Sequence, residues 1–274
     1  MPLEHDRCIC LRKVEYSETS QILTLFARRH GRVQLIAKGA HRRTKAGASK
    51  FDGGVDLLDL GEAVFSHAPE RDLCPLTEWH LVEGHLDLRR DLRPMRLALY
   101  AAELVNLLIE EHDPHVELFD RLEQMLRELG SPRVEEAFFA FELDLLREAG
   151  YLPELAGCVE CGATQFDARE PLFFSPHRGG VVCRNCEGLS PDRIEVDPRL
   201  LRIVRSVLTL PREPSGTVQR LPRLTRHQTD PINQMLARHI EHTLGRRLRM
   251  PRWVLGDGSV EPSAPQIVRP TFIT

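Results

Sequence analysis

Two pairs of cysteines constrain the fold of this chain more than any other feature of its sequence. Each pair has the pattern Cys-x-x-Cys, and the pairs are Cys158/Cys161 and Cys183/Cys186. Such a turn places two thiolates side by side, and two facing turns make a tetrahedral all-sulfur site suited to Zn²⁺. Residues 162–182 separate the pairs, which is close to the usual zinc-ribbon spacing. The sequence therefore predicts one zinc ion per chain.

Four sulfur ligands leave no open position for water, so this zinc is expected to fold the segment around it rather than to catalyse. Two disulfides, an Fe–S cluster or a redox dithiol are the alternatives, and His177 could replace one sulfur.

Residues 1–14 contain several charges and no apolar stretch, and no uninterrupted apolar run is long enough to span a membrane. We therefore expect a cytoplasmic protein, whose reduced thiols favour a metal over disulfides. The remaining cysteines are expected to be buried as small apolar side chains: Cys8, Cys10 and Cys74.

The net charge of −3 conceals a strong segregation of charge along the chain. Residues 1–50 contain eleven Lys/Arg and four Asp/Glu, whereas residues 51–200 contain fourteen and thirty-one. Residues 201–250 contain ten and three. Polyanions respond to local patches of charge, so the two basic regions are candidate contacts for a nucleic acid. The alternative is that they pair with the acidic helices inside the fold.

The first 82 residues have the pattern of a β domain. Five short segments rich in Ile, Leu, Val and Phe are separated by polar turns. Gly31 lies in one of these turns, where it can supply a positive φ. These segments are 8–14, 21–27, 32–37, 55–66 and 73–82. Five strands without a helical period predict a small closed barrel of the OB type over residues 1–82.

The period becomes helical from Pro94 onwards, which predicts a helical domain over residues 83–255. Amphipathic stretches around 94–108, 116–129 and 138–150 precede the cysteine segment at 153–190, and helices are expected again at 198–210 and 231–248. Residues 256–274 hold three prolines and little apolar periodicity, so we expect a disordered tail. The predicted fold class is α+β, an OB barrel followed by a helical domain with an inserted four-cysteine zinc finger.

A basic, glycine-punctuated loop over residues 38–50 is the best candidate for phosphate contacts. OB barrels combine such charge with exposed aromatic rings. Phe26, Phe65 and Trp79 are expected in the core, and Phe51, beside the loop, is the one weak stacking candidate. The alternative is a solvated excursion without a ligand. The predicted contacts are Lys38, His41, Arg42, Arg43, Lys45 and Lys50.

A second basic group lies on the last predicted helix, beside His239 and His242. It either complements the helix macrodipole or forms a docking edge for DNA or an acidic peptide. This group comprises Arg238, Arg246, Arg247 and Arg249. No catalytic pattern is apparent, and the pairs Glu110-Glu111 and Glu135-Glu136 are expected on solvent-facing helix surfaces. We therefore predict a protein that is not an enzyme.

Two stretches of the sequence carry specific motifs. The first runs Glu15-x-x-Glu18-x-x-x-Ile22-Leu23-Thr24-Leu25-Phe26, then His30-Gly31-Arg32 and Ala37-Lys38-Gly39-Ala40-His41-Arg42. The second runs Phe141-Glu142-Leu143-x-Leu145-Leu146-x-x-x-Gly150-Tyr151-x-Pro153-x-Leu155 into Cys158-x-x-Cys161-Gly162. Both stretches resemble the bacterial RecO family. The similarity covers roughly residues 5–250, and His41 departs from the basic residue that many relatives carry.

The resemblance implies an OB domain, a helical domain and a zinc finger that some family members lack. It also implies a DNA repair protein that binds single- and double-stranded DNA and anneals complementary strands. With RecR, such a protein helps to load RecA onto strands coated by single-strand binding protein (SSB), whose acidic and apolar C-terminal tail is an expected ligand of the helical domain. Two other classes remain open: a zinc-containing nuclease or topoisomerase-like enzyme, and a zinc-bearing module that only docks proteins.

Overall fold

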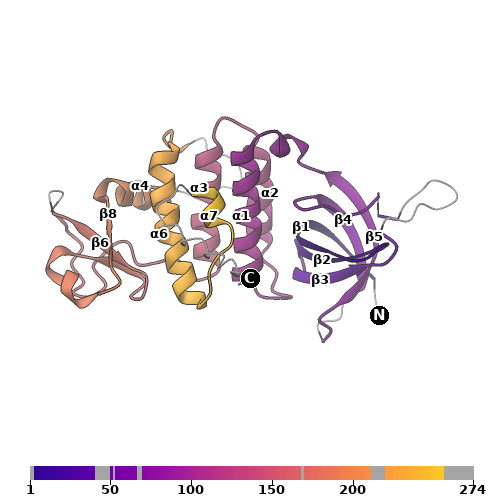
Figure 1. The fold of residues 1–274 in the computed structure, drawn as a ribbon, viewed down its shortest axis with the longest axis horizontal. Coiled ribbons are helices and arrows are strands. Elements are labelled where there is room, and N and C mark those ends of the chain that lie inside the picture. The colour runs from indigo at the N-terminus through magenta and orange to yellow at the C-terminus, as the bar shows by residue number, and fades with distance from the viewer. Residues whose placement is uncertain are drawn as a thin grey trace, which may run out of the picture.

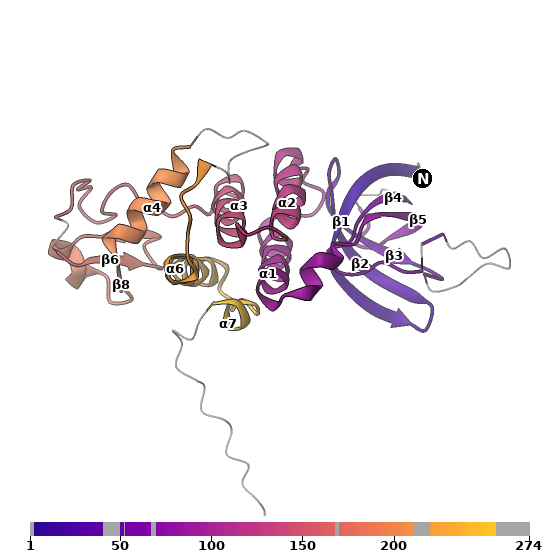
Figure 2. The same cartoon turned by 90° about the horizontal axis from the view of Figure 1, so that it is seen from above.

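The structure is a computed structural model that describes residues 3–40, 50–51, 53–66, 70–167, 170–210 and 220–255. A β-barrel, a group of helices and a small cysteine-rich sheet follow one another along the long axis of the molecule (Figure 1). Seen from above, the helices lie between the barrel and the small sheet (Figure 2). The predicted tail, 256–274, and most of the predicted basic loop fall outside the described residues.

The barrel confirms the predicted β domain. Its strands are β1 (Leu3–Ser17), β2 (Ser20–Ala27), β3 (Gly31–Ala37), β4 (Leu60–Ser66) and β5 (Cys74–Glu83). They close in the order β1-β2-β3-β5-β4, with β3 and β5 parallel and the other neighbours antiparallel, as an OB-fold requires. The fourth strand begins later than the predicted Val55, because the backbone at Leu58 has a φ of 68° that a strand cannot contain.

Gly31 stands at the turn between β2 and β3 with a φ of 69°, as its position predicted. A Cβ atom at this position would lie 2.2 Å from the carbonyl oxygen of Asp113, in the segment that follows the first long helix. The neighbouring Arg32 donates from Nε to the carbonyl oxygen of Ile109 at 3.0 Å. The turn therefore has a second role that the sequence did not reveal, because it fixes the barrel against the helical domain.

Helices and two short 3-10 turns follow the barrel, together with a small sheet described below. The turns are η1 (Leu86–Arg90) and η2 (Arg184–Leu189), and the helices are α1 (Leu92–Leu108), α2 (Val116–Glu128), α3 (Val134–Glu148), α4 (Pro198–Leu208), α6 (Arg226–Leu244) and α7 (Pro251–Val254). The predicted start of the last long helix at Pro231 was wrong. A capping box of Thr225 and Gln228 begins α6 five residues earlier, and the proline lies inside the helix.

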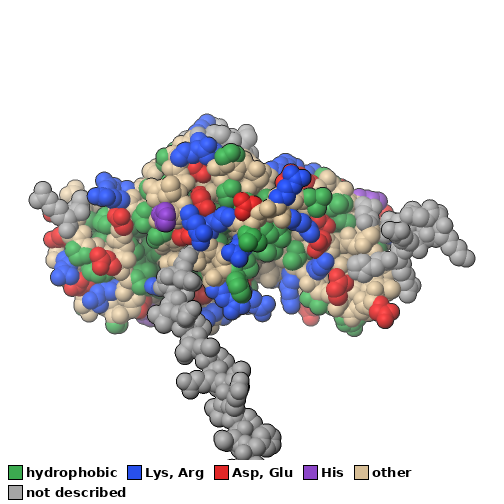
Figure 3. All heavy atoms as spheres, turned by 45° about the horizontal axis from the view of Figure 1, so that its top comes forward, with side chains coloured by type: hydrophobic (Ala, Val, Ile, Leu, Met, Phe, Trp, Pro, Cys, Tyr) green, Lys and Arg blue, Asp and Glu red, His purple; other side chains and the backbone are tan. Residues whose placement is uncertain are grey.

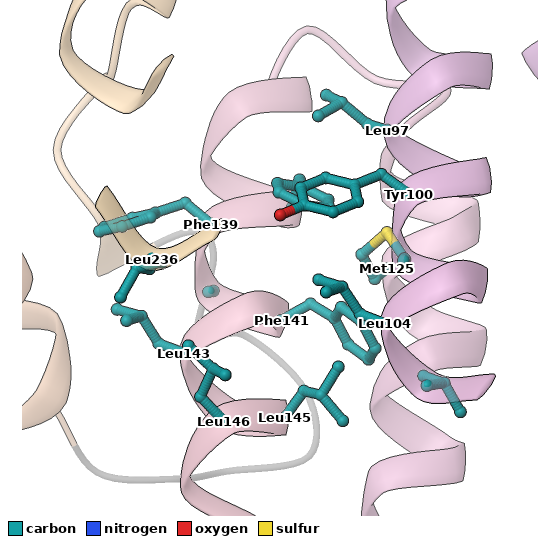
Figure 4. Packing of buried hydrophobic residues seen from close by; sticks show 14 of the residues in the cluster. Leu97, Tyr100, Leu104, Met125, Phe139, Phe141, Leu143, Leu145, Leu146 and Leu236 are labelled. Carbon is teal, nitrogen blue, oxygen red and sulfur yellow. The ribbon is translucent and has the colours of Figure 1, made fainter. Parts of the chain in front are cut away.

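The central helix α3 is buried on nearly all sides. Its aromatic and leucine side chains pack against α1 and α2 on one side and against α6 on the other (Figure 4). The same apolar core continues into the barrel, because Ile9, Leu11 and Phe26 point outward from the strands and join it. The rings of Phe26 and Phe119 lie 5.7 Å apart across this boundary. The barrel interior forms a separate core, while the domain limits 1–82, 83–255 and 256–274 stay a prediction.

The expectation that Glu135 and Glu136 face solvent was wrong. Glu136 is only 1% exposed and accepts a hydrogen bond from the backbone N–H of Leu224 at 3.0 Å, so it does not face solvent. Glu135 pairs with Arg93 at 2.7 Å, and the same guanidinium pairs with Asp230 at 2.6 Å. The physical reason is that α3 is enclosed on several sides, so its polar positions cross-link neighbouring helices. Among the described residues, no helix is both long and apolar enough to cross a membrane.

Candidate metal centre and nucleic-acid interface

The cysteine-rich module is built around a small antiparallel sheet. Its strands β6 (Leu172–Ser175), β7 (Gly180–Val182) and β8 (Ile194–Val196) lie in the order β7-β6-β8. The first cysteine pair is held on this sheet, because the backbone N–H of Val159 donates to Val181 at 2.8 Å. The second pair begins directly after β7, at Cys183. The sheet thus brings Cys158 and Cys183 into contact, although they are 25 residues apart in sequence.

The four cysteines form one cluster, as their spacing predicted. Their sulfur atoms all lie within 4.8 Å of one another, and those of Cys161 and Cys183 are 3.8 Å apart. A tetrahedral site with Zn–S bonds of about 2.3 Å has edges of about 3.8 Å, so this arrangement fits a tetrahedral metal ion. The turn after Cys158 closes through Gly162, whose φ is 74° and whose N–H donates to the Cys158 carbonyl at 2.8 Å.

The electrostatics of the cluster favour a cation at its centre. Burial raises the pKa of Cys158, but hydrogen bonds from the backbone N–H groups of Cys183, Cys161 and Glu160 outweigh burial and lower it to about 7. The pKa of Cys186 is raised to about 12 by burial and by the three neighbouring thiols. One thiolate therefore forms easily, and its negative charge opposes the ionisation of the other thiols. A divalent cation would compensate the negative charge of all four thiolates.

His177 does not join the cysteines. Its Nδ1 lies 3.1 Å from Nε2 of His242 on α6, and its backbone N–H donates to Asp192 at 2.8 Å. The sulfur cluster is complete without it. The other cysteines are buried in the barrel core as predicted, with Cys8 and Cys10 fully enclosed. Burial, followed by the charges of neighbouring Asp59 and Asp56, raises the pKa of Cys10, so its thiol stays protonated at neutral pH.

The predicted DNA contacts are described only in part. Lys38 and Lys50 are exposed at the two ends of the basic loop, beside the barrel. His41, Arg42, Arg43 and Lys45 lie outside the described residues. Most of the other N-terminal arginines are used within the fold: Arg28 pairs with Asp120 at 2.7 Å, and Arg7 and Arg32 pair with carboxylates that follow the barrel in sequence. Pairing inside the fold, the alternative to DNA contact, thus accounts for these arginines. Lys38 and Lys50 remain available on the surface.

A pocket beside this loop contains an aromatic residue that sequence reasoning missed. It is lined by Tyr16, Lys38 and Lys50 among others, and Tyr16 is 66% exposed. Phe51 was the expected stacking residue, but its side chain is buried in the barrel core at 5% exposure. The signal for Tyr16 was available, because it follows Val14 on the outward-facing side of β1, next to a polar turn.

The second basic group lies on the surface of α6 and the segment after it. Its four arginines are exposed, and none of them forms an ion pair with another described residue. They are Arg238, Arg246, Arg247 and Arg249. His242 is exposed beside them, whereas His239 is buried and its Nε2 lies 3.0 Å from the Tyr151 carbonyl oxygen. The group is therefore not neutralised by the acidic helices.

Comparison with known proteins matches both halves of the chain to one family. The family model "Recombination protein O N terminal" matches residues 1–85, and "Recombination protein O C terminal" matches residues 89–251. A protein named DNA repair protein RecO from Rhodopirellula baltica is 35% identical over 211 residues, which is 77% of each chain. The protein of that name from Anaeromyxobacter dehalogenans is 32% identical over 247 residues, covering 90% of this chain and 93% of its own.

Proposed function

Because the chain belongs to the RecO family of DNA repair proteins, we propose that it binds DNA and anneals complementary strands during recombinational repair. With RecR, it would help to load RecA onto single-stranded DNA coated by SSB. The observation that carries this proposal is the match of both the barrel and the helical domain to one repair family, over most of the chain. We also propose a cytoplasmic location at the nucleoid, where a repair protein meets its DNA.

The basic loop and the pocket beside Tyr16 are the proposed DNA contact of the barrel. The exposed ring of Tyr16 lines the same pocket as Lys38 and Lys50, so it offers a stacking surface close to two cations that can contact phosphates. Loop cations contact the backbone and not the base edges, so binding should be independent of sequence and sensitive to salt. His41, Arg42, Arg43 and Lys45 would extend the same contact.

A structural Zn²⁺ is the proposed occupant of the cysteine cluster, with Cys158, Cys161, Cys183 and Cys186 as its ligands. All four positions around the ion would be taken by sulfur, which provides folding energy and no site for substrate or water. We therefore propose a binding and annealing protein rather than an enzyme. The alternatives, a zinc-containing nuclease or topoisomerase-like enzyme and a module that only docks proteins, predict strand cleavage in the first case and no DNA binding in the second.

The proposed protein ligand is the C-terminal tail of SSB, at the helical domain. An acidic and apolar peptide suits a domain with unpaired arginines and exposed leucines, and its few buried residues imply micromolar affinity that weakens with salt. Titration of a labelled tail peptide into the full chain tests this. No binding at about 100 μM peptide in low salt would remove SSB recruitment and leave the annealing role.

An annealing assay with complementary oligonucleotides tests the main proposal. The chain should accelerate duplex formation without Mg²⁺ or ATP, and both strands should stay intact. Replacing Arg42 and Arg43 by Ala should reduce the slope of log K against log salt by about two units or less, equally for all sequences. Arg90→Ala is a matched control, because Arg90 is 82% exposed on η1, away from the barrel pocket. An unchanged slope in the double variant would move the contact elsewhere, and Mg²⁺-dependent cleavage would favour an enzyme.

A further inference from the structure

An exposed tryptophan follows the second basic group in the chain, and this combination is not explained by packing. Trp253 on α7 is 54% exposed, and Cζ of Arg252 lies over its ring at 5.0 Å from the centroid. We propose that Trp253 and the arginines that precede it form a second binding site for single-stranded nucleic acid, on the helical domain and apart from the barrel. This inference rests on the proposed function only in taking DNA as a ligand of the chain.

The backbone on both sides of the tryptophan is held by hydrogen bonds. The loop before α7 is tied to α1, because the Glu103 carboxylate accepts the backbone N–H groups of Arg249 and Met250, both at 2.8 Å. After the tryptophan, the carbonyl of Val254 accepts a hydrogen bond from Arg93, whose guanidinium is anchored in the ion pairs with α3 and α6. A ring on a held backbone loses less conformational entropy when a ligand stacks on it.

The segment that carries this ring is rich in positive charge. In residues 238–253 the arginines outnumber the single carboxylate, Glu241, which itself accepts the backbone N–H of Leu248 at 2.9 Å. Arg246, Arg247 and Arg249 are exposed, and within residues 220–255 no ion pair holds them. Blue side chains gather over α6 and α7 in the space-filling view, with hydrophobic side chains beside them (Figure 3). The surface therefore attracts an anion while presenting an aromatic face.

A single strand fits this chemistry best. Its unpaired bases can stack on an indole, its phosphates can meet the arginines, and neither interaction requires a particular sequence. A duplex would offer the phosphates but keep its bases enclosed. The surface lies on the helices and the pocket of Tyr16 lies on the barrel, at different positions along the molecule (Figures 1 and 2). One chain would therefore contact single strands at two places, a useful arrangement for a protein that anneals them.

Intrinsic fluorescence tests the proposal directly, because the chain contains only two tryptophans and Trp79 is fully buried in the barrel. A Trp79→Phe variant, in which Trp253 is the sole tryptophan, should lose fluorescence when an oligothymidylate of about 20 nucleotides stacks on the ring. Fluorescence anisotropy of labelled DNA measures total binding in parallel. Trp253→Ala should weaken single-strand binding about fivefold or more, and Trp253→Phe should restore most of it. Arg246→Ala with Arg247→Ala should reduce quenching and flatten its salt dependence.

The possible failures are distinguishable. Anisotropy showing DNA binding without quenching of Trp253 would overturn the second site and leave the proposed function intact. Absence of DNA binding in both measurements would overturn both. Equal quenching by a duplex would exclude base stacking. Quenching by an acidic SSB-tail peptide at lower concentrations than by the oligonucleotide would assign the surface to a protein ligand instead.

Discussion

The barrel and the cysteine module solve the same folding problem in different ways. The barrel encloses its own apolar core and shares a second one with the helices. Among the described residues, the module's own cluster holds Phe173 and Val182 besides three of the cysteines, with Val159 and Phe166 packed against it. Its other face, with Leu172, Phe174 and Val181, joins the core of the helices. Apolar burial of about 25 cal/mol per Å² stabilises the barrel from within, whereas the half of the module that carries the cysteines buries little apolar surface of its own to offset the conformational entropy of its segment. We therefore predict that this half of the module requires a cross-link at its cysteines and that the barrel does not.

The largest expected effect is the loss of the metal site. Cys158→Ser, or a strong chelator, should release the ion and unfold the module around residues 154–196, while the barrel stays folded. Hydrogen exchange measured by mass spectrometry checks this, since protection should fall in the module and persist in β1–β5. Cys74→Ala is the matched control, because Cys74 is a buried barrel cysteine outside the cluster and should keep the metal bound. Freshly purified protein without zinc, or with an Fe–S absorption band, would contradict the assignment.

The next effect concerns how the barrel is attached to the helices. Gly31→Ala adds a Cβ that must displace the Asp113 backbone and places Ala at a φ of 69°. The backbone conformation alone costs about 1–2 kcal/mol, so the clash should raise the loss of unfolding free energy above that range. Denaturant titration measures this loss. Gly150→Ala is the control, because Gly150 has a φ of 76° and open space around it. Equal losses in the two variants would show that the Asp113 contact contributes nothing.

A pH dependence of stability should arise from a buried carboxylate of the helical core. Glu142 is fully buried, and burial raises its pKa from an ordinary value of 4.5 to about 8. Between these two pKa values the folded chain binds one more proton than the unfolded chain. The stabilisation that the protonated Glu142 contributes is therefore complete below about pH 4.5 and is lost as the pH rises to about 8. The slope is at most about 1.4 kcal/mol per pH unit.

Glu142→Gln should remove this slope, because an amide does not titrate. It should also preserve a polar partner for Asn233, whose amide nitrogen can donate to Glu142 Oε2 at 3.0 Å. Unfolding free energies measured from pH 5 to pH 8 check the effect, and Glu117→Gln on the exposed face of α2 is the matched control. A wild-type slope that persists in Glu142→Gln would assign the titration to another group.

The smallest effect should come from the ion pair between Arg28 and Asp120. Both side chains are about 40% exposed, at 38% and 41%, so solvent screens the pair that joins the barrel to α2. A double-mutant cycle with Arg28→Ala and Asp120→Ala should give a coupling free energy below about 1 kcal/mol. Phe119→Ala in the apolar part of the same interface should cost about 3–5 kcal/mol. A coupling that matches the Phe119 loss would mean that charge, and not burial, attaches the barrel.

Local patterns in the sequence predicted much of the fold and one site. The five strands, the helical stretches and the metal cluster depend on periodicity and on short spacings, which hold wherever the segments pack. Other predictions were wrong for two kinds of reason. Local signals that were not recognised set two boundaries: the capping box upstream of Pro231 begins α6, and the backbone at Leu58 delays β4 beyond Val55. Packing decided the rest, because Phe51 and Glu136 are buried while Tyr16 remained outside.

By itself the sequence predicted that the four cysteines would meet in one cluster, because two Cys-x-x-Cys turns each place two sulfurs side by side. It also determined that β1 would be strongly apolar, from Cys8 to Leu11. Only the tertiary structure decided that this strand is buried on both faces, with Cys8 inside the barrel and Ile9 against the helices. The same holds for the enclosed Glu142 and the exposed Trp253. The period of a segment specifies which side chains share a face, whereas burial depends on what packs against that face, and that partner is distant in sequence.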